Sequence, residues 1–287
     1  MKFCSILVFL FFLALTSNAQ FFDQNFLSKV KQIDEFIDRF NYDEENARGY
    51  ALLSKRASTH QDMAEIYEYI YGDKHTDRVD VLLSLFSYEN ALSIGKKNIR
   101  EFVLQTTDST NQRKLGFYDD DWYAVVTGEV TYKGHKESVQ LTLKNKMGKT
   151  RDGQDGSYWA LVSARADFLF KPADIDKRLG VNAGSHGVNF VPLISALEDQ
   201  DNAYNLTAEE YEPDTLSIFL YAVQNGELSF NSVKAVNYHF LQIDGWIFSV
   251  EYFNRSDSNS GWLISDLIKV EEDDQKQLYR SEILSLR

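Results

Sequence analysis

The chain has 287 residues and carries 30 lysines and arginines against 43 aspartates and glutamates, which gives a formal net charge of −13 at neutral pH. An acidic surface of this kind repels phosphate backbones and anionic lipid headgroups, so a nucleic-acid-binding or lipid-docking function is not expected. The single cysteine is Cys4, so a chain that lacks the first residues has no disulfide, no thiolate metal site and no cysteine nucleophile.

The first residues predict a secretory signal peptide over residues 1–19. Lys2 supplies a positive charge, Ile6–Leu15 is an unbroken apolar run, and small residues at Ser17 and Ala19 favour cleavage after Ala19. The run is too short to cross a bilayer comfortably, since a spanning helix needs about 20 apolar residues. We therefore expect an exported protein, periplasmic or extracellular, with no transmembrane segment in the mature chain.

Apolar residues at helical spacing predict a helical region ahead of residue 95. The first helix is expected to begin near Asp23 and to end near Asn41. A second helix is expected to open at the capping box Thr59–Asp62 and to end at Gly72. A third apolar segment, Val79–Phe86, continues the region. The apolar face of the first helix consists of Phe22, Phe26, Val30, Ile33, Phe36, Ile37 and Phe40.

From Trp122 onward the apolar residues alternate with polar ones, which predicts half-buried strands instead of helices. Three strands are expected, and the glycines between them predict the connecting turns. The expected elements are a strand from Trp122, a turn at Lys133–His135, a strand around Val139–Leu143, a polar loop over Met147–Gly156 and a strand over Tyr158–Phe168.

A glycine-containing stretch with little apolar periodicity predicts a linker between two α+β domains. We place the N-terminal domain at residues 20–175, the linker at 176–189 and the C-terminal domain at 190–287. The second domain is expected to repeat helices and then strands. Its expected elements are helices over Phe190–Leu197 and from Pro213 to Asn225–Gly226, with Leu216, Phe219, Leu220 and Val223 on one face of the latter, and strands over Phe230–Ile243, Trp246–Asn254 and Trp262–Val270, with a turn at Asp244–Gly245.

Two segments of the first half have counterparts in the second, which indicates an internal duplication. Val139–Asn145 parallels Phe248–Asn254, and Trp159–Ser163 parallels Trp262–Ser265. In both halves a glycine turn comes first, and a polar loop leads to the tryptophan-containing strand. Two unrelated antiparallel meanders are the alternative interpretation.

Helices followed by a curved antiparallel meander, twice over, resemble the NTF2-like (cystatin-like, SnoaL-like) superfamily. Phe219–Glu227 and the strand ending at Trp262–Leu267 carry most of the resemblance, and this half is also similar to exported proteins of Bacteroidota. The resemblance implies two tandem domains, each folding helices across a curved antiparallel sheet around a cone-shaped pocket. It implies no particular reaction, because the superfamily includes enzymes, binding modules and accessory domains.

Aromatic residues on the expected strands are the candidate ligand-binding residues. On a concave sheet, such rings can stack on a sugar ring or enclose a hydrophobic ligand. Packing in the core is the alternative for each of them. The candidates are Trp122, Trp159, Tyr238, Trp246, Tyr252 and Trp262.

One histidine is a candidate for catalysis. His239 lies on an expected strand and is a possible general base, assisted by Glu251 or Asp266, with a structural histidine as the alternative. No HExxH or GxSxG motif and no glycine-rich phosphate loop occurs, so no metal or cofactor is expected. The three carboxylates of Asp119–Asp121 are interpreted as a solvated turn.

Three hypotheses of function follow from these observations. The preferred one is a non-enzymatic envelope protein that binds a small ligand, a glycan or a protein segment. The second is an NTF2-like lyase, isomerase or hydrolase with His239 as its general base. The third is a scaffold for an envelope assembly, which predicts a stable protein partner.

Overall fold

The computed structural model describes residues 33–42, 68–69, 77–110, 113–149, 153–169, 197–198, 205–208, 211, 213–256 and 259–286. The expected signal peptide, the capping box at Thr59–Asp62, the linker at 176–189 and most of the helix expected over Phe190–Leu197 lie outside these residues. They stay predictions.

Within the described residues the chain alternates between groups of helices and groups of strands, as an α+β protein does. The helices are α3 (Ile33–Asn41), α6 (Asp77–Leu83), α7 (Tyr88–Ile94), α8 (Lys96–Thr106), α10 (Thr215–Gln224) and α11 (Asp273–Glu282). The strands are β1 (Trp122–Tyr132), β2 (His135–Lys149), β3 (Asp155–Arg165), β4 (Leu228–Phe240), β5 (Trp246–Phe253) and β6 (Gly261–Lys269).

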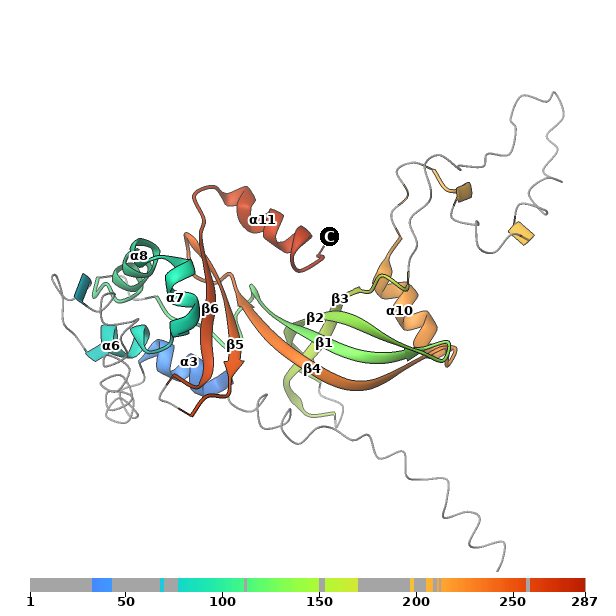
Figure 1. The fold of residues 1–287 in the computed structure, drawn as a ribbon, viewed down its shortest axis with the longest axis horizontal. Coiled ribbons are helices and arrows are strands. Elements are labelled where there is room, and N and C mark those ends of the chain that lie inside the picture. Colours follow the sequence, from blue (N-terminus) through green and yellow to red (C-terminus); the bar gives the residue numbers. More distant parts are fainter. Residues whose placement is uncertain are drawn as a thin grey trace, which may run out of the picture.

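The strands β1 to β6 form one antiparallel sheet in the order β3-β2-β1-β4-β5-β6 (Figure 1). β1 pairs with β4 along its whole length, from Trp122 opposite Phe240 to Tyr132 opposite Leu228. This pairing corrects the expectation of one sheet in each half. β1 and β4 are each the first strand of a meander, and pairing the two open edges satisfies their backbone N–H and C=O groups.

The two meanders carry their irregularities at matching places. In β3 the register shifts at Val162, three residues after Trp159, and in β6 it shifts at Ser265, three residues after Trp262. Trp159 lies opposite Asn145, and Trp262 lies opposite Tyr252. If the two tryptophans are equivalent, Asn145 corresponds to Tyr252, which lies two residues before the Asn254 that the sequence comparison aligned with it. This arrangement is what an internal duplication would produce, and the duplication stays our interpretation.

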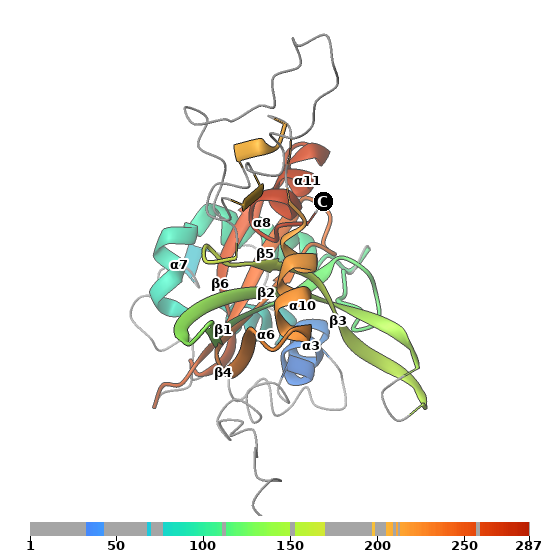
Figure 2. The same ribbon diagram turned by 90° about the vertical axis from the view of Figure 1, so that its right-hand side faces the viewer.

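The helices pack across the two halves of the sheet. α7 and α8, which precede β1 in the chain, contact β6 at the far edge of the second meander. α10, which precedes β4, contacts β3 at the far edge of the first meander as well as β4 itself (Figure 2). Each meander is thus covered partly by helices from the other half, which ties the halves together.

Glycine turns set two of the strand connections where the sequence predicts them. Lys133 and Gly134 both have positive φ, 49° and 87°, the conformation of a type I′ hairpin turn between β1 and β2. Gly245 has a φ of 77° in the turn that leads into β5. Gly226, with a φ of 71°, likewise follows Asn225, the C-cap residue of α10.

The main core lies between α3, α6, α7 and α8 and one face of the sheet. Phe40 of α3 stacks on Phe248 with ring centroids 5.7 Å apart, and Phe248 stacks on Phe240 at 5.0 Å. Trp122 then stacks on Phe240 at 5.3 Å, which extends the column to β1. The apolar face predicted for the first helix is confirmed over Ile33–Phe40, where it is buried.

The opposite face of the sheet is covered by α11 (Figure 1). Residues alternate between the two faces along β1, so that Trp122 contributes to the main core while Tyr123 and Val125 pack in a separate cluster. Leu284, which follows α11 and is fully buried, belongs to that second cluster. The sequence analysis did not predict α11.

Some predicted elements differ from the observed ones. The loop expected over Met147–Gly156 is shorter, because β2 continues to Lys149 and β3 begins at Asp155. Leu220 and Val223 were expected on the buried face of α10 but are 45% and 44% exposed. Phe219 and Ala222 are the residues that α10 buries, since its contact with β3 and β4 covers a narrow face.

The outer edge of β6 is paired with the segment that joins α6 to α7. The Ser87 N–H donates to the Ile264 carbonyl at 2.9 Å, and the Ile264 N–H donates to the Leu85 carbonyl at 2.7 Å. Phe86 and Ile264 form a parallel bridge at this point. Such pairing satisfies backbone groups that would otherwise be open at the sheet edge.

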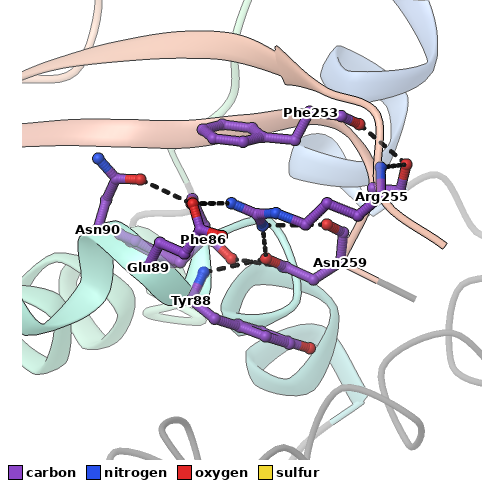
Figure 3. A network of polar contacts seen from close by, with 9 residues as sticks. Phe86, Tyr88, Glu89, Asn90, Phe253, Arg255 and Asn259 are labelled. Carbon is purple, nitrogen blue, oxygen red and sulfur yellow. Dashed lines mark hydrogen bonds and ion pairs between the residues drawn. The ribbon is translucent and has the colours of Figure 1, made fainter. Parts of the chain in front are cut away.

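Asn259 fastens the β5–β6 connection to the same segment (Figure 3). Its Oδ1 accepts hydrogen bonds from the Tyr88 backbone N–H at 3.0 Å and from Arg255 Nη1 at 2.5 Å. Its Nδ2 donates to the Phe86 carbonyl at 2.8 Å. Arg255 also pairs with Glu89 at 2.8 Å. Because Asn259 is fully buried, water cannot replace these partners.

Replacing Asn259 with alanine should destabilise the protein strongly. Asn259→Ala leaves the Tyr88 N–H and the Phe86 carbonyl without their side-chain partner, and we expect the free energy of unfolding to fall by about 2–4 kcal/mol. Urea denaturation measures the loss. The control is Asn254→Ala, an exposed asparagine before the same loop, which should change stability by less than about 0.5 kcal/mol. Equal losses in the two variants would contradict the role given to Asn259.

Candidate functional site

A row of polar side chains crosses the sheet face under α11. Strand register places Lys144 opposite Tyr123, Tyr123 opposite His239, His239 opposite Ser249 and Ser249 opposite Asp266. The row therefore runs through β2, β1, β4, β5 and β6, with a lysine at one end and an aspartate at the other. The β1–β4 pairing brings its two halves together.

α11 and the residues after it are anchored over this row. The Thr142 hydroxyl donates to the Leu284 carbonyl at 3.0 Å, beside the buried Leu284 side chain. Lys276 Nζ donates to the carbonyls of Leu241 and Ile243 at 2.6 and 3.0 Å. Contacts of Lys276 within α11 and of Leu284 after it therefore hold the helix on the sheet. A hollow remains on either side of the helix.

The hollow on the β5–β6 side, which we call the acidic groove, has a volume of about 500 Å³. It lies between the sheet and α11. Its size is within the ordinary range for small-molecule sites. It is lined by Asn237, His239, Ile247, Ser249, Glu251, Asp266, Ile268, Gln275, Leu278, Tyr279, Glu282 and Ile283.

The structure thus brings together the three residues that the sequence singled out for catalysis, His239, Glu251 and Asp266. His239 has a different hydrogen-bond partner from the expected carboxylates, since its Nδ1 lies 2.8 Å from the Tyr279 hydroxyl. Glu251 accepts a hydrogen bond from the Ser265 hydroxyl at 3.1 Å instead. The groove is therefore a polar site with two separate hydrogen-bonded pairs.

His239 is a neutral imidazole at physiological pH. Its side chain is 8% exposed, and burial lowers its pKa to about 4. Burial, followed by the charge of Asp266, raises the pKa of Tyr279, so that hydroxyl keeps its proton. Among the described residues, Tyr279 is the hydrogen-bond partner of the ring, and Nε2 has none. The second ring nitrogen is available to a ligand in the groove.

The aromatic candidates for ligand binding lie in or against the main core. Trp122, Tyr238, Trp246 and Trp262 are at most 4% exposed. The rings contact each other, as Tyr238 does with Trp262 at 4.9 Å between centroids. Their burial corresponds to core packing, the alternative left open by the sequence. The two half-buried candidates, which pack against that core, are Trp159 and Tyr252.

The acidic turn at Asp119–Asp121 anchors two basic side chains. Asp120 pairs with Lys144 at 2.7 Å, and Asp121 pairs with Arg280 of α11 at 3.0 Å. Among the described residues, no group of three or more histidine, cysteine, aspartate or glutamate side chains is arranged to hold a metal ion. These carboxylates serve as partners for cations of the protein.

Sequence reasoning missed the residues that α11 contributes. Tyr279 of α11 completes the groove, yet the helix is mostly polar and lacks a long apolar stripe. A local pattern does mark its beginning, because Glu272 and Gln275 form a capping box. Leu278, Tyr279 and Ile283, which line the groove, have the spacing of one helix face. These patterns, taken together, indicate a short amphipathic helix.

Comparisons of this chain with protein-family models, curated proteins and solved structures found no match. No helix in the part of the chain that the structure describes has the length and apolar character needed to cross a membrane. Arguments about function therefore rest on the geometry and chemistry of the site.

The buried histidine should make stability depend on pH. The folded-state pKa of His239 lies near 4, below its ordinary value of 6.5, so the unfolded chain binds the proton more tightly. Stability is complete above about pH 6.5 and falls as the pH approaches 4. Relative to His239→Gln, the wild-type free energy of unfolding should drop by about 2–3 kcal/mol between pH 7.5 and 4.5.

Urea denaturation of both proteins at the two pH values measures this difference. The carboxyls of Glu251, Asp266 and Glu282 line the same groove. They are present in both proteins, so their contribution largely cancels. A wild-type minus variant difference that stays constant with pH would show that His239 is not held neutral by burial.

Proposed function

We propose that this protein is an exported, non-enzymatic binding protein that holds a small organic cation with an apolar portion in the acidic groove. The observation that carries the proposal is the composition of the groove. Among the described residues, Glu251, Asp266 and Glu282 line it and no lysine or arginine does, and its histidine is neutral. Its negative charge is therefore not balanced within the lining.

The walls of the groove suit the apolar portion of such a ligand. Ile247, Ile268, Leu278 and Ile283 are placed around the carboxylates, and Ile268 and Ile283 are 38% and 50% exposed. Covering exposed apolar surface is favourable by about 25 cal/mol per Å². A ligand with one cationic and one apolar end satisfies both parts of the lining.

His239 adds a directional contact inside the groove. Nε2 is without a partner among the described residues, and in the tautomer whose Nδ1–H donates to the Tyr279 hydroxyl it accepts a hydrogen bond from a ligand N–H. The hydroxyl of Ser249, another residue of the lining, lies 3.0 Å from the Ser265 hydroxyl. The acidic protein as a whole also attracts cations toward the groove.

The general-base hypothesis for His239 has weaker support. A general base works best when its pKa lies near the operating pH, whereas burial places the pKa of His239 near 4. The ring is oriented by the Tyr279 hydroxyl and not by a carboxylate. An Asp or Glu partner would stabilise the protonated ring, and this arrangement does not. Binding is therefore the function that we favour.

We also infer that the molecule consists of two NTF2-like halves fused through β1 and β4. The support is the meander on either side of this pair, each with its register shift three residues after a tryptophan. The signal peptide that the sequence predicts over residues 1–19 supports export of the whole unit. The residues described in the lining of the binding groove all come from the second half, from β4, β5, β6, α11 and Ile283.

The proposal predicts selectivity for the cation among three probes with the same ring. The mature chain, residues 20–287, is titrated with phenethylamine, 2-phenylethanol and phenylacetate by isothermal calorimetry at constant ionic strength. Phenethylamine should bind, and the neutral and anionic probes should bind at least tenfold more weakly, because the carboxylates favour the ammonium group. Equal binding of the three probes would refute a cation site.

Variants locate the binding in the groove. Glu251→Gln and Asp266→Asn should each lower the affinity for phenethylamine about tenfold or more, since each removes a charged acceptor. Glu137→Gln is the matched control, because Glu137 lines a different hollow on the sheet and its loss changes the net charge equally. A loss of the same size in the control would mean that overall charge, and not the groove, attracts the probe.

A further inference from the structure

A second hollow lies on the other side of α11, at the lysine end of the polar row. We call it the basic cavity, and its volume is about 540 Å³. Residues of β1, β2, β3, α11, the beginning of α10 and the C-terminal segment meet there. It is lined by Tyr123, Lys144, Val162, Ser163, Asp214, Thr215, Leu216, Gln277, Arg280, Ser285 and Leu286.

The two cations of this lining are more buried than their carboxylate partners. Lys144 is 19% exposed while Asp120 is 80% exposed, and Arg280 is 23% exposed while Asp121 is 42% exposed. The positive ends therefore face inward and the negative ends face water. Asp120 and Asp121 are adjacent in the chain, so the two cations are held at the same end of the cavity.

Arg280 has unused hydrogen-bonding capacity. A guanidinium group has five N–H donors in a planar fork, and it cannot lose its charge in a protein. Nη2 donates to Asp121 at 3.0 Å. Among the described residues, the guanidinium group has no hydrogen bond or ion pair with any other residue. The remaining donors match the paired oxygens of a carboxylate or phosphate group.

Lys144 is fixed beside this fork. The hydrogen bond to Asp120 raises the pKa of Lys144 above its usual value, so it is charged at neutral pH. Its Nζ also lies 5.9 Å from the centre of the Tyr123 ring, a cation–π distance. Asp214 is the one carboxylate among the described lining residues, and it accepts hydrogen bonds from the Leu216 N–H and the Ser217 hydroxyl at the start of α10.

Ser163 contributes a hydroxyl to the cavity wall. The residue is 4% exposed and lines the cavity. Its hydroxyl has no hydrogen-bond partner among the described residues. A serine hydroxyl that is open to a cavity can donate a hydrogen bond to an oxygen of a ligand bound there.

From these contacts we propose that the basic cavity is a second binding site, which takes a small oxyanion, a carboxylate or a phosphate. Arg280 holds two of its oxygens with the guanidinium fork, Lys144 balances the charge, and the Ser163 hydroxyl binds a further oxygen. This goes beyond the cation site of the acidic groove, and the two sites lie on opposite flanks of α11.

Calorimetric titration of the mature chain with succinate and, separately, with inorganic phosphate tests the proposal. Both are run against sodium chloride at matched ionic strength. Saturable binding of either anion is expected, and the one that binds more tightly distinguishes a carboxylate site from a phosphate site. An absence of saturable binding for both anions would overturn the proposal.

Matched variants assign the binding to the cavity. Arg280→Gln and Lys144→Met should each weaken the anion at least tenfold, and Ser163→Ala should weaken it severalfold. The control is Arg113→Gln, because Arg113 is 22% exposed and pairs with the exposed Asp244 away from the cavity. Its affinity should stay within twofold of wild type, and a loss equal to that of Arg280→Gln would overturn the assignment.

Two further measurements keep the result interpretable. Lys144→Met leaves only the exposed Asp120 without a partner, so this variant should fold even if Arg280→Gln does not, and circular dichroism confirms the fold. Glu251→Gln should bind the anion as the wild type does. Failure of the cation probes with intact anion binding would reject the acidic groove alone, and the reverse outcome would reject the basic cavity alone.

Discussion

The pairing of β1 with β4 is the constraint on which the rest of the molecule depends. It joins the first strands of two meanders, so that strands from both halves share one sheet. The polar row from Lys144 to Asp266 exists only because Tyr123 and His239 lie opposite each other in this pair. Of the two hollows on the α11 face, the acidic groove is lined by β4, β5, β6 and α11, while the basic cavity combines β1, β2 and β3 with α11 and the beginning of α10.

α11 separates the acidic groove from a cavity whose lining includes the ion-paired Lys144 and Arg280. Tyr279 on one flank contacts His239, and Arg280 on the other contacts Asp121. Neighbouring residues of a helix point in different directions, so one short helix can complete an acidic groove and a basic cavity at once. The buried Leu284 supplies apolar anchoring, while the polar contacts set the position of the helix over the row.

Much of the fold could be predicted from local patterns. The alternation from Trp122 onward indicates strands. The strands β2, β4 and β5 begin just after Gly134, Gly226 and Gly245, which all have positive φ. α11 was missed because Asp273–Glu282 is mostly polar, so that its capping box and a few spaced apolar residues are the local signals of a helix there. The aromatic residues were placed on strands correctly, but alternation alone does not say which face becomes the core.

The sequence by itself determined the α+β class, the order of the strands, the glycine turns and the candidates His239, Glu251 and Asp266, because these depend on residues close together in the chain. Only the tertiary structure decided that the two meanders share a sheet, that the aromatic candidates pack in the core and that Tyr279 is the partner of His239. Those outcomes depend on pairing and burial between distant segments, for which no local periodicity carries information.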